Sequence, residues 1–327
     1  MKLLIENFPN QLKEAIEIGE KIKLNKGNKP FSNVVVTGMG GSGIGGTLLG
    51  ELVAKEAKIP VLVNKNYFLP YYIDENSLVI VSSYSGNTEE TIQSLESALE
   101  KGAKVVSVSS GGKLKEIAES QNIDHITIPS GMPPRAALGY SLVQMLFILY
   151  NFDIIGAGFK EDLYASITLL EKEQENIKSQ AENIAKTLLG KTVVIYSPFG
   201  EEGVALRLRQ ELNENSKVLA WHNTIPEMNH NELVGWAEKH DDLAVVFFRN
   251  NTDYARVSKR IDLTKEIVLK YASKVVEIYS KGSSPIERAM YHVHTGDFIS
   301  SYLAEIRNID PNEIQVIDYL KSSLASK

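Results

Sequence analysis

A segment in the second half of the chain repeats a segment in the first half. Residues 34–64, VVVTGMGGSGIGGTLLGELVAKEAKIPVLVN, align without a gap to residues 193–223, VVIYSPFGEEGVALRLRQELNENSKVLAWHN, at an offset of 159. An offset of 165 then aligns LVIVSSYSGNTEE, from Leu78, with LAVVFFRNNTDYA, from Leu243. Repeats of this kind indicate duplicated structural units. We therefore expect two similar subdomains whose connecting loops differ.

Each copy alternates short β-branched runs with stretches of helical period, which predicts βαβ units and a parallel sheet. The expected fold is α/β, with two subdomains that each form a three-layer arrangement of helices around a parallel sheet. The expected boundaries are 1–155 for the first subdomain with an N-terminal helix, 156–190 for a connecting helix, and 191–327 for the second with C-terminal helices. The charged middle segment is typical of a solvated helix. A parallel sheet binds ligands at the carboxyl ends of its strands.

Composition excludes several classes of protein. The chain has no cysteine, which rules out disulfides, thiolate metal sites and a thiol nucleophile. A net charge of −6 argues against nucleic acid as a partner. The N-terminus lacks the pattern of a signal peptide, so we expect a cytoplasmic protein. The most apolar stretch, 141–159, is interrupted by polar residues and predicts a buried helix rather than a membrane span.

A glycine-rich loop follows the first predicted strand. Residues 38–46, GMGGSGIGG, match G-x-G-x-x-G between a strand and a helix, as in dinucleotide sites. Such sites also need an acidic residue after the next strand, where this chain has Asn64, Lys65 and Asn66. The absence of that carboxylate disfavours a nicotinamide cofactor.

A second polar loop follows the third strand. In residues 82–91, SSYSGNTEET, the hydroxyls of Ser83, Ser85 and Thr88 can surround a phosphate monoester beside the N–H groups of the next helix. Gly41 and Ser42 of the first loop complete the predicted phosphate site. The alternative is a capping box formed by residues 88 and 91, but a cap needs only one hydroxyl.

This second loop resembles the signature of the sugar isomerase (SIS) fold. Three further segments resemble the bifunctional phosphoglucose/phosphomannose isomerases: PSGMPPRAALGYS at 129–141, NENSK at 213–217 and PEMNHNELVGW at 226–236. The resemblance spans essentially the whole chain. It implies isomerisation of glucose 6-phosphate, and of mannose 6-phosphate, to fructose 6-phosphate through a cis-enediolate. The substrate is a small sugar phosphate, and no metal or redox cofactor is implied.

The resemblance also implies roles for four residues. Glu214 is the base, and it follows a predicted helix whose terminal carbonyls repel a carboxylate. His230 assists ring opening in the site of a neighbouring subunit, which implies a homodimer. Arg135 stabilises the enediolate, a role that suits a permanently charged guanidinium. Lys321 helps to open the ring, although a terminal amphipathic helix also explains this lysine.

The remaining histidines have weaker claims. His292 and His294 are two apart on a predicted helix, so they face different directions and do not form a metal pair. The other three, His125, His222 and His240, are expected to be structural or exposed.

Two other functions use the same fold, and the second of them is excluded. A phosphosugar-binding regulator would use SIS loops without turnover, but would not need Glu214, His230 and Arg135 together. An amidotransferase-type synthase requires a cysteine nucleophile, which the chain lacks. The family's relaxed specificity depends on a small residue near Ile314 or Gln315, and a glutamine there would leave mannose activity open.

Overall fold

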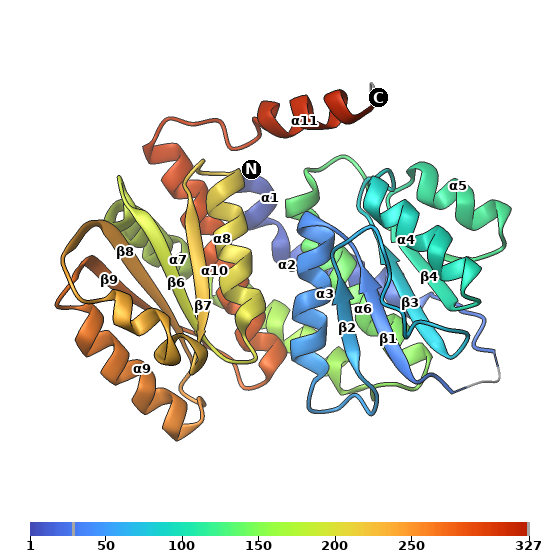
Figure 1. The fold of residues 1–327 in the computed structure, drawn as a ribbon, viewed down its shortest axis with the longest axis horizontal. Coiled ribbons are helices and arrows are strands. Elements are labelled where there is room, and N and C mark those ends of the chain that lie inside the picture. Colours follow the sequence, from blue (N-terminus) through green and yellow to red (C-terminus); the bar gives the residue numbers. More distant parts are fainter. Residues whose placement is uncertain (28–29, 326–327) are drawn as a thin grey trace.

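Two parallel β-sheets lie side by side, each covered by helices (Figure 1). The computed structural model describes residues 1–27 and 30–325. The first sheet has the order β2-β1-β3-β4-β5 and the second the order β7-β6-β8-β9. All pairings in both sheets are parallel. This confirms the predicted α/β fold with two related sheets.

The first subdomain contains the following elements: α1 Lys2–Glu6, α2 Phe8–Glu20, β1 Asn33–Thr37, α3 Gly40–Val53, β2 Val61–Asn64, β3 Ser77–Ser82, α4 Glu89–Glu100, β4 Lys104–Ser109, α5 Gly112–Ser120, β5 Asp124–Thr127, the 3₁₀ turn η1 Pro134–Ala137 and α6 Leu138–Asn151. Almost every side chain of α6 is buried. A helix that is apolar on all sides packs in a core. None of the helices in residues 1–27 and 30–325 is long and apolar enough to cross a membrane.

The rest of the chain forms α7 Gly158–Leu188, β6 Thr192–Pro198, α8 Glu202–Glu214, β7 Ala220–Ile225, the 3₁₀ turns η2 Glu227–His230 and η3 Glu232–Gly235, β8 His240–Arg249, α9 Ala255–Val268, β9 Ala272–Tyr279, α10 Pro285–Ile306 and α11 Gln315–Ala325. Helix α7 is solvated on only one side. Its other side carries buried apolar residues at intervals of three, four and seven positions and packs mainly against α10. The connecting helix is therefore part of the core as well as a link.

The strand registers correct one detail of the internal repeat. Strands β1 and β6 keep the offset of 159, but their pairing with β3 and β8 aligns Val79 with Val245, an offset of 166 rather than 165. The counterpart of Thr88 is then Tyr254, and each of these residues precedes the helix that follows its strand. Backbone hydrogen bonds fix register, whereas the sequence comparison depended on a few similar side chains.

The two sheets run in opposite directions, because α3 and α8 pack side by side in an antiparallel pair (Figure 1). Glu51, near the end of α3, accepts hydrogen bonds from the backbone N–H of Gly203 at the start of α8, at 3.0 and 3.1 Å. Each helix leaves the carboxyl edge of its own sheet. The carboxyl edge of the first sheet therefore lies at the same end of the molecule as the amino edge of the second.

We expect the Glu51 contact to make stability depend on pH. Burial raises the pKa of Glu51 from 4.5 to about 7, although the Gly203 N–H favours the charged form. Between these values the folded chain holds a proton that the unfolded chain has lost, so stability falls as pH rises through this window. Glu51→Gln removes the titration. Its stability relative to wild type should therefore improve steadily between pH 4.5 and 7, measured by urea unfolding.

The exposed Glu20→Gln variant is the matched control and should track wild type at every pH. A constant difference between Glu51→Gln and wild type across this window would show that Glu51 does not titrate there.

Candidate active site

The N-termini of α3 and α4 meet at the carboxyl edge of the first sheet. Neither helix has a side-chain hydrogen bond at its N-cap, so backbone N–H groups in both first turns are available to an anion. Two acidic residues, Glu89 and Glu90, begin α4 and partly offset its positive end. This favours α3 as the stronger of the two anion-binding ends.

The predicted phosphate hydroxyls are close together, but they differ in accessibility. Ser83 and Thr88 hydrogen-bond to each other at 2.9 Å, and Ser42 accepts a hydrogen bond from the Tyr84 N–H at 3.2 Å. Ser42 and Ser83 are buried, whereas Ser85 is exposed. The capping-box alternative is wrong, since the Thr88 hydroxyl does not cap α4. Instead, the Thr88 hydroxyl is hydrogen-bonded to the Ser83 hydroxyl within the loop.

Gly41 allows α3 to approach the turn that carries Arg135. A Cβ at Gly41 would lie 2.9 Å from the carbonyl oxygen of Pro134, so a larger residue would push the two apart. The glycine therefore brings the N-terminus of α3 next to η1. This packing requirement explains Gly41 independently of any phosphate.

Arg135 is buried, at 4% exposure, and its guanidinium contacts three residues in two separate segments. Its Nη1 donates to Glu214 Oε2 at 3.1 Å, its Nε to Asn215 Oδ1 at 2.8 Å, and its Nη2 to the Pro311 carbonyl at 2.5 Å. The first two residues belong to the end of α8 in the second subdomain. A side chain of the first subdomain is thus paired with the predicted base across the boundary between the sheets.

Glu214 is the last residue of α8, whereas the sequence pattern predicted that it would follow the helix. Lys217 follows with a left-handed backbone, φ 52°, and its ammonium donates to the Glu214 carbonyl at 2.6 Å. Burial lowers the pKa of Lys217. The side chain of Glu214 is 31% exposed. The carbonyl groups at the end of α8 repel the Glu214 carboxylate, whereas Arg135 attracts it. Only the repulsion could be inferred from the sequence.

Lys321 lies on α11, which crosses above the boundary between the subdomains (Figure 1). Together with Ile317, Leu320 and Leu324, it lines a cavity of about 430 Å³ whose opposite wall includes Ser85 and Thr88. The structure therefore brings the C-terminal lysine to the phosphate loop, more than 200 residues away in the sequence.

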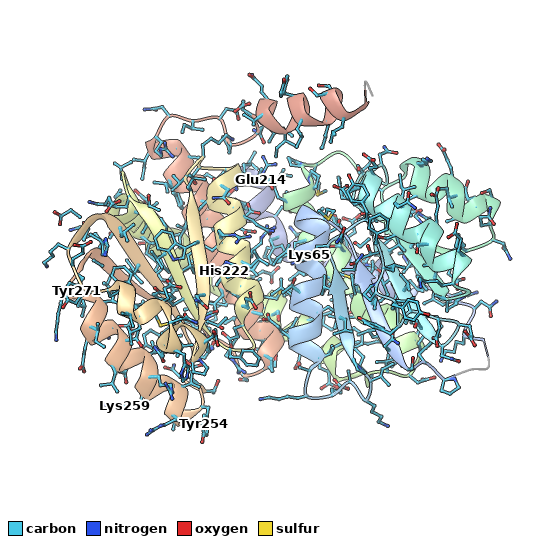
Figure 2. All side chains as sticks on the ribbon, viewed as in Figure 1. Lys65, Glu214, His222, Tyr254, Lys259 and Tyr271 are labelled. Carbon is cyan, nitrogen blue, oxygen red and sulfur yellow. The ribbon has the colours of Figure 1, made fainter. Side chains whose placement is uncertain are left out.

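His230 lies at the other end of the second sheet. It is exposed at the end of η2, which follows the carboxyl end of β7, whereas Glu214 lies at the amino edge of the same sheet. In Figure 2, Glu214 is labelled at one end of the second subdomain and Tyr254, which follows the carboxyl end of β8, at the other. Thirteen residues of α8 span about 20 Å. His230 cannot reach Glu214 of its own chain.

Three of the other histidines lie in surroundings that the structure describes in detail. His292 and His294 are fully buried on α10 and contact different rings, those of Phe248 and Phe298 respectively. Burial lowers the pKa of each to about 3, so both remain neutral. His222 lies 3.3 Å from Glu202, facing Lys65 across the boundary in Figure 2. His292 and His294 therefore contact different aromatic rings around α10, those of Phe248 and Phe298.

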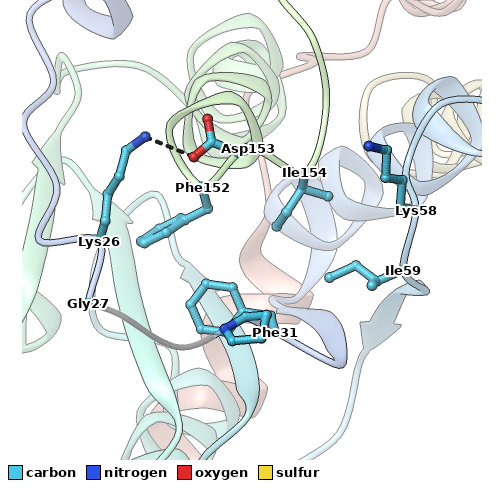
Figure 3. A pocket seen from close by; sticks show the side chains of 9 residues that line it. Lys26, Gly27, Phe31, Lys58, Ile59, Phe152, Asp153 and Ile154 are labelled. Carbon is cyan, nitrogen blue, oxygen red and sulfur yellow. Dashed lines mark hydrogen bonds and ion pairs between the residues drawn. The ribbon is translucent and has the colours of Figure 1, made fainter.

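A larger cavity, of about 490 Å³, lies away from these residues (Figure 3). Phe31, Phe152 and Ile154 line it, and Lys26 pairs with Asp153 at its rim at 3.1 Å. It carries none of the residues expected to act in the reaction. The smaller cavity beneath α11 is the better candidate, because Lys321 and two of the predicted phosphate-binding residues, Ser85 and Thr88, line it.

Comparison with known proteins finds one SIS domain in each half of the chain. Residues 31–152 match the SIS domain family, and residues 177–324 match the bacterial phospho-glucose isomerase C-terminal SIS domain. Over 332 aligned residues, covering 98% of both chains, the sequence is 40% identical to the bifunctional phosphoglucose/phosphomannose isomerase of Caldicellulosiruptor bescii. The chain belongs to the bifunctional phosphoglucose/phosphomannose isomerase family. The same-named protein of Thermoplasma acidophilum is 36% identical and matches 90% of each chain.

Solved structures share the fold of this isomerase family member at low identity. The C-terminal domain of glucosamine-fructose-6-phosphate aminotransferase from Francisella tularensis has a TM-score of 0.75, with 13% identity over 95% of this chain and 97% of that one. The tagatose-6-phosphate ketose/aldose isomerase of Escherichia coli has a TM-score of 0.69, with 16% identity over 94% and 93%. These likenesses establish the double-SIS architecture alone.

Two contributors to the site were missed by the sequence analysis. Asn215 was noted only as part of a motif, and Pro311 was not considered, yet both accept hydrogen bonds from Arg135. A polar residue directly after the predicted base was the only available signal for Asn215. Nothing in the sequence indicates a role for a backbone carbonyl.

Proposed function

We propose that this protein interconverts glucose 6-phosphate, and mannose 6-phosphate, with fructose 6-phosphate by proton transfer through a cis-enediolate. The observation that carries the proposal is the Arg135–Glu214 contact at the phosphate-binding end of the first sheet. A base and a fixed cation next to an anion site are the groups that this reaction requires. Family membership supports the same activity.

We assign each residue one role. The N-terminus of α3, with Gly41, Ser42, Ser83, Ser85 and Thr88, holds the phosphate. Glu214 takes the proton from C2 and returns it at C1. Arg135 stabilises the negative charge that develops on the enediolate oxygens, and Lys321 assists ring opening from α11. Rotation about the C2–C3 bond before the proton returns would let the same site accept mannose 6-phosphate.

The assay that tests the proposal measures both sugar phosphates on one preparation, with and without EDTA. We expect turnover of glucose 6-phosphate that EDTA leaves unchanged, because the proposed groups need no metal. Absence of turnover with measurable sugar-phosphate binding would favour a phosphosugar-binding regulator instead. Turnover of glucose 6-phosphate without turnover of mannose 6-phosphate would restrict the proposal to the first substrate. It would point to Gln315 as the residue that excludes the second.

We propose a homodimer in which His230 enters the partner's site. The support is geometric, since His230 and Glu214 lie at opposite edges of one sheet and His230 is exposed. A two-fold axis can bring one edge of each subunit to the other edge of its partner. A cytoplasmic location and a place in glycolysis and gluconeogenesis would follow from the activity. We also propose the subdomain limits 1–155, 156–190 and 191–327, because α7 lies between the strands of the first sheet and those of the second.

Mixing two inactive variants tests the shared site. Glu214→Gln and His230→Ala homodimers each lack one group in both sites, but a heterodimer has one complete site. After unfolding and refolding an equimolar mixture, we expect about a quarter of wild-type activity, because half of the dimers are mixed and half of their sites are intact. Refolding each variant alone is the control. No recovery in the mixture, with heterodimers detected, would place His230 in its own chain's site or outside it.

A further inference from the structure

Behind Arg135 lies a closed ring of buried hydrogen bonds that the proposed reaction does not use. Asn215 accepts from Arg135 Nε and donates through Nδ2 to Glu211 Oε2 at 2.7 Å. Arg207 Nη1 lies 2.8 Å from Glu211 Oε1, and its Nη2 donates to the Arg135 carbonyl at 2.7 Å. The ring thus returns to Arg135 through its main chain. All four residues are at most 4% exposed.

A second set of contacts anchors the ring to α10. Arg207 makes a bidentate contact with Asp297, in which Nε and Nη2 donate to the carboxylate at 3.0 and 2.9 Å. Asn215 Nδ2 also donates to Ser300 Oγ at 3.0 Å. Bidentate arginine–carboxylate pairs fix orientation as well as position. The anchoring joins α8, η1 and α10 in one rigid unit.

The geometry points to Asn215 as the positioning residue that aims the Arg135 guanidinium at the reacting centre, with Arg207 holding the Arg135 main chain. This inference rests on the proposed isomerase function. Arg135 contacts Glu214 through one nitrogen only, and that contact leaves rotation about the bond open. The Asn215 contact at Nε and the Pro311 carbonyl contact at Nη2 together fix the plane of the guanidinium, so that Nη1 faces Glu214.

The orientation of the Asn215 amide explains why the residue is not an aspartate. Its oxygen faces a guanidinium, but its nitrogen faces the Glu211 carboxylate. Aspartate would place two carboxylates in contact, and such a pair keeps a shared proton at low pH. Burial already raises the pKa of Glu211, opposed by Arg207 and Arg135 and reinforced by Asp297 and Glu214.

The first test compares Asn215→Leu with wild type in steady-state kinetics. We expect kcat to fall at least about tenfold with KM within about twofold, because the enediolate is bound less well and the phosphate loop is untouched. Ser300→Ala is the matched control. It removes one partner of the same amide but leaves the Arg135 and Glu211 contacts, so its kcat should stay near wild type. Wild-type kcat in folded Asn215→Leu would overturn the inference.

Asn215→Asp supplies a test that a merely structural role does not predict. While the carboxyl pair shares its proton, the introduced carboxyl group can still accept from Arg135, so the variant should be most active at low pH. Relative to wild type, its kcat should fall about tenfold or more as the pH rises and the pair of residue 215 and Glu211 loses that proton, because the two carboxylates then repel each other. A constant ratio over this range would contradict the role assigned to the amide.

A readout independent of turnover separates this inference from the proposed function. With ¹⁵N-labelled arginine, the Nε–H of Arg135 should exchange slowly in wild type and at least about tenfold faster in Asn215→Leu. In Asn215→Asp the same acceleration should appear only after the carboxyl pair has lost its shared proton. If wild type has no isomerase activity but this difference holds, the proposed function fails and the positioning stands. Equal exchange rates would overturn the positioning even in an active enzyme. Should Asn215→Leu not fold, Asn215→Asp decides both readouts.

Discussion

Glu214→Gln should lower kcat by about 10²–10⁴-fold, the usual contribution of a positioned acid–base group. The substitution keeps the shape of the side chain, and its amide oxygen can still accept from Arg135 Nη1. What it removes is the ability to take the proton from C2. We expect KM to change little, because the proposed phosphate-binding residues lie at the start of α3 and in the loop before α4.

Isotope exchange identifies the step that Glu214→Gln blocks. In D₂O, wild type should introduce deuterium at C2 of recovered glucose 6-phosphate, and the variant should lose this exchange together with isomerisation. Glu202→Gln, at the exposed start of the same helix, is the control and should behave as wild type. Continued exchange at C2 in Glu214→Gln would assign the base to another residue.

Replacing Arg135 should damage both catalysis and stability. Arg135→Met removes the cation beside the enediolate, and loss of such a group costs about 10²–10³-fold in kcat. It also leaves Asn215 Oδ1 and the Pro311 carbonyl without their donor. Breaking a fully buried ion pair costs roughly 3–5 kcal/mol. We expect a smaller loss here because Glu214 is 31% exposed and water can replace part of the contact.

Arg135→Lys separates charge from geometry. An ammonium keeps the charge but cannot direct three donors at Glu214, Asn215 and the Pro311 carbonyl at once, so it should not restore kcat. The exposed Arg256→Met variant on α9 is the control for loss of one arginine. Full activity in Arg135→Lys would mean that charge alone is sufficient and that the fork geometry is unimportant.

Much of the fold could be predicted because local patterns encode it. Alternating strand and helix periods predicted both parallel sheets, and the repeat predicted their similarity. The buried helix around residues 138–151 follows from its continuous apolar sequence. The one-residue error in the repeat arose where loops replace Ser83 and its neighbours with unrelated residues, so side-chain similarity no longer tracks backbone register.

The sequence by itself determined the duplicated α/β architecture, the hydroxyl-rich loop and the motifs that contain Arg135, Glu214 and His230. Only the tertiary structure decided how they combine. Packing of α3 against α8 turns the second sheet to face the opposite way, so Arg135, next to the N-terminus of α3, meets Glu214, while His230 lies at the far edge. The same packing brings Asn215, directly after α8, within hydrogen-bonding distance of Arg135. Periodicity reports which face of one element is buried, whereas the relation between two bodies depends on long-range contacts that no local pattern contains.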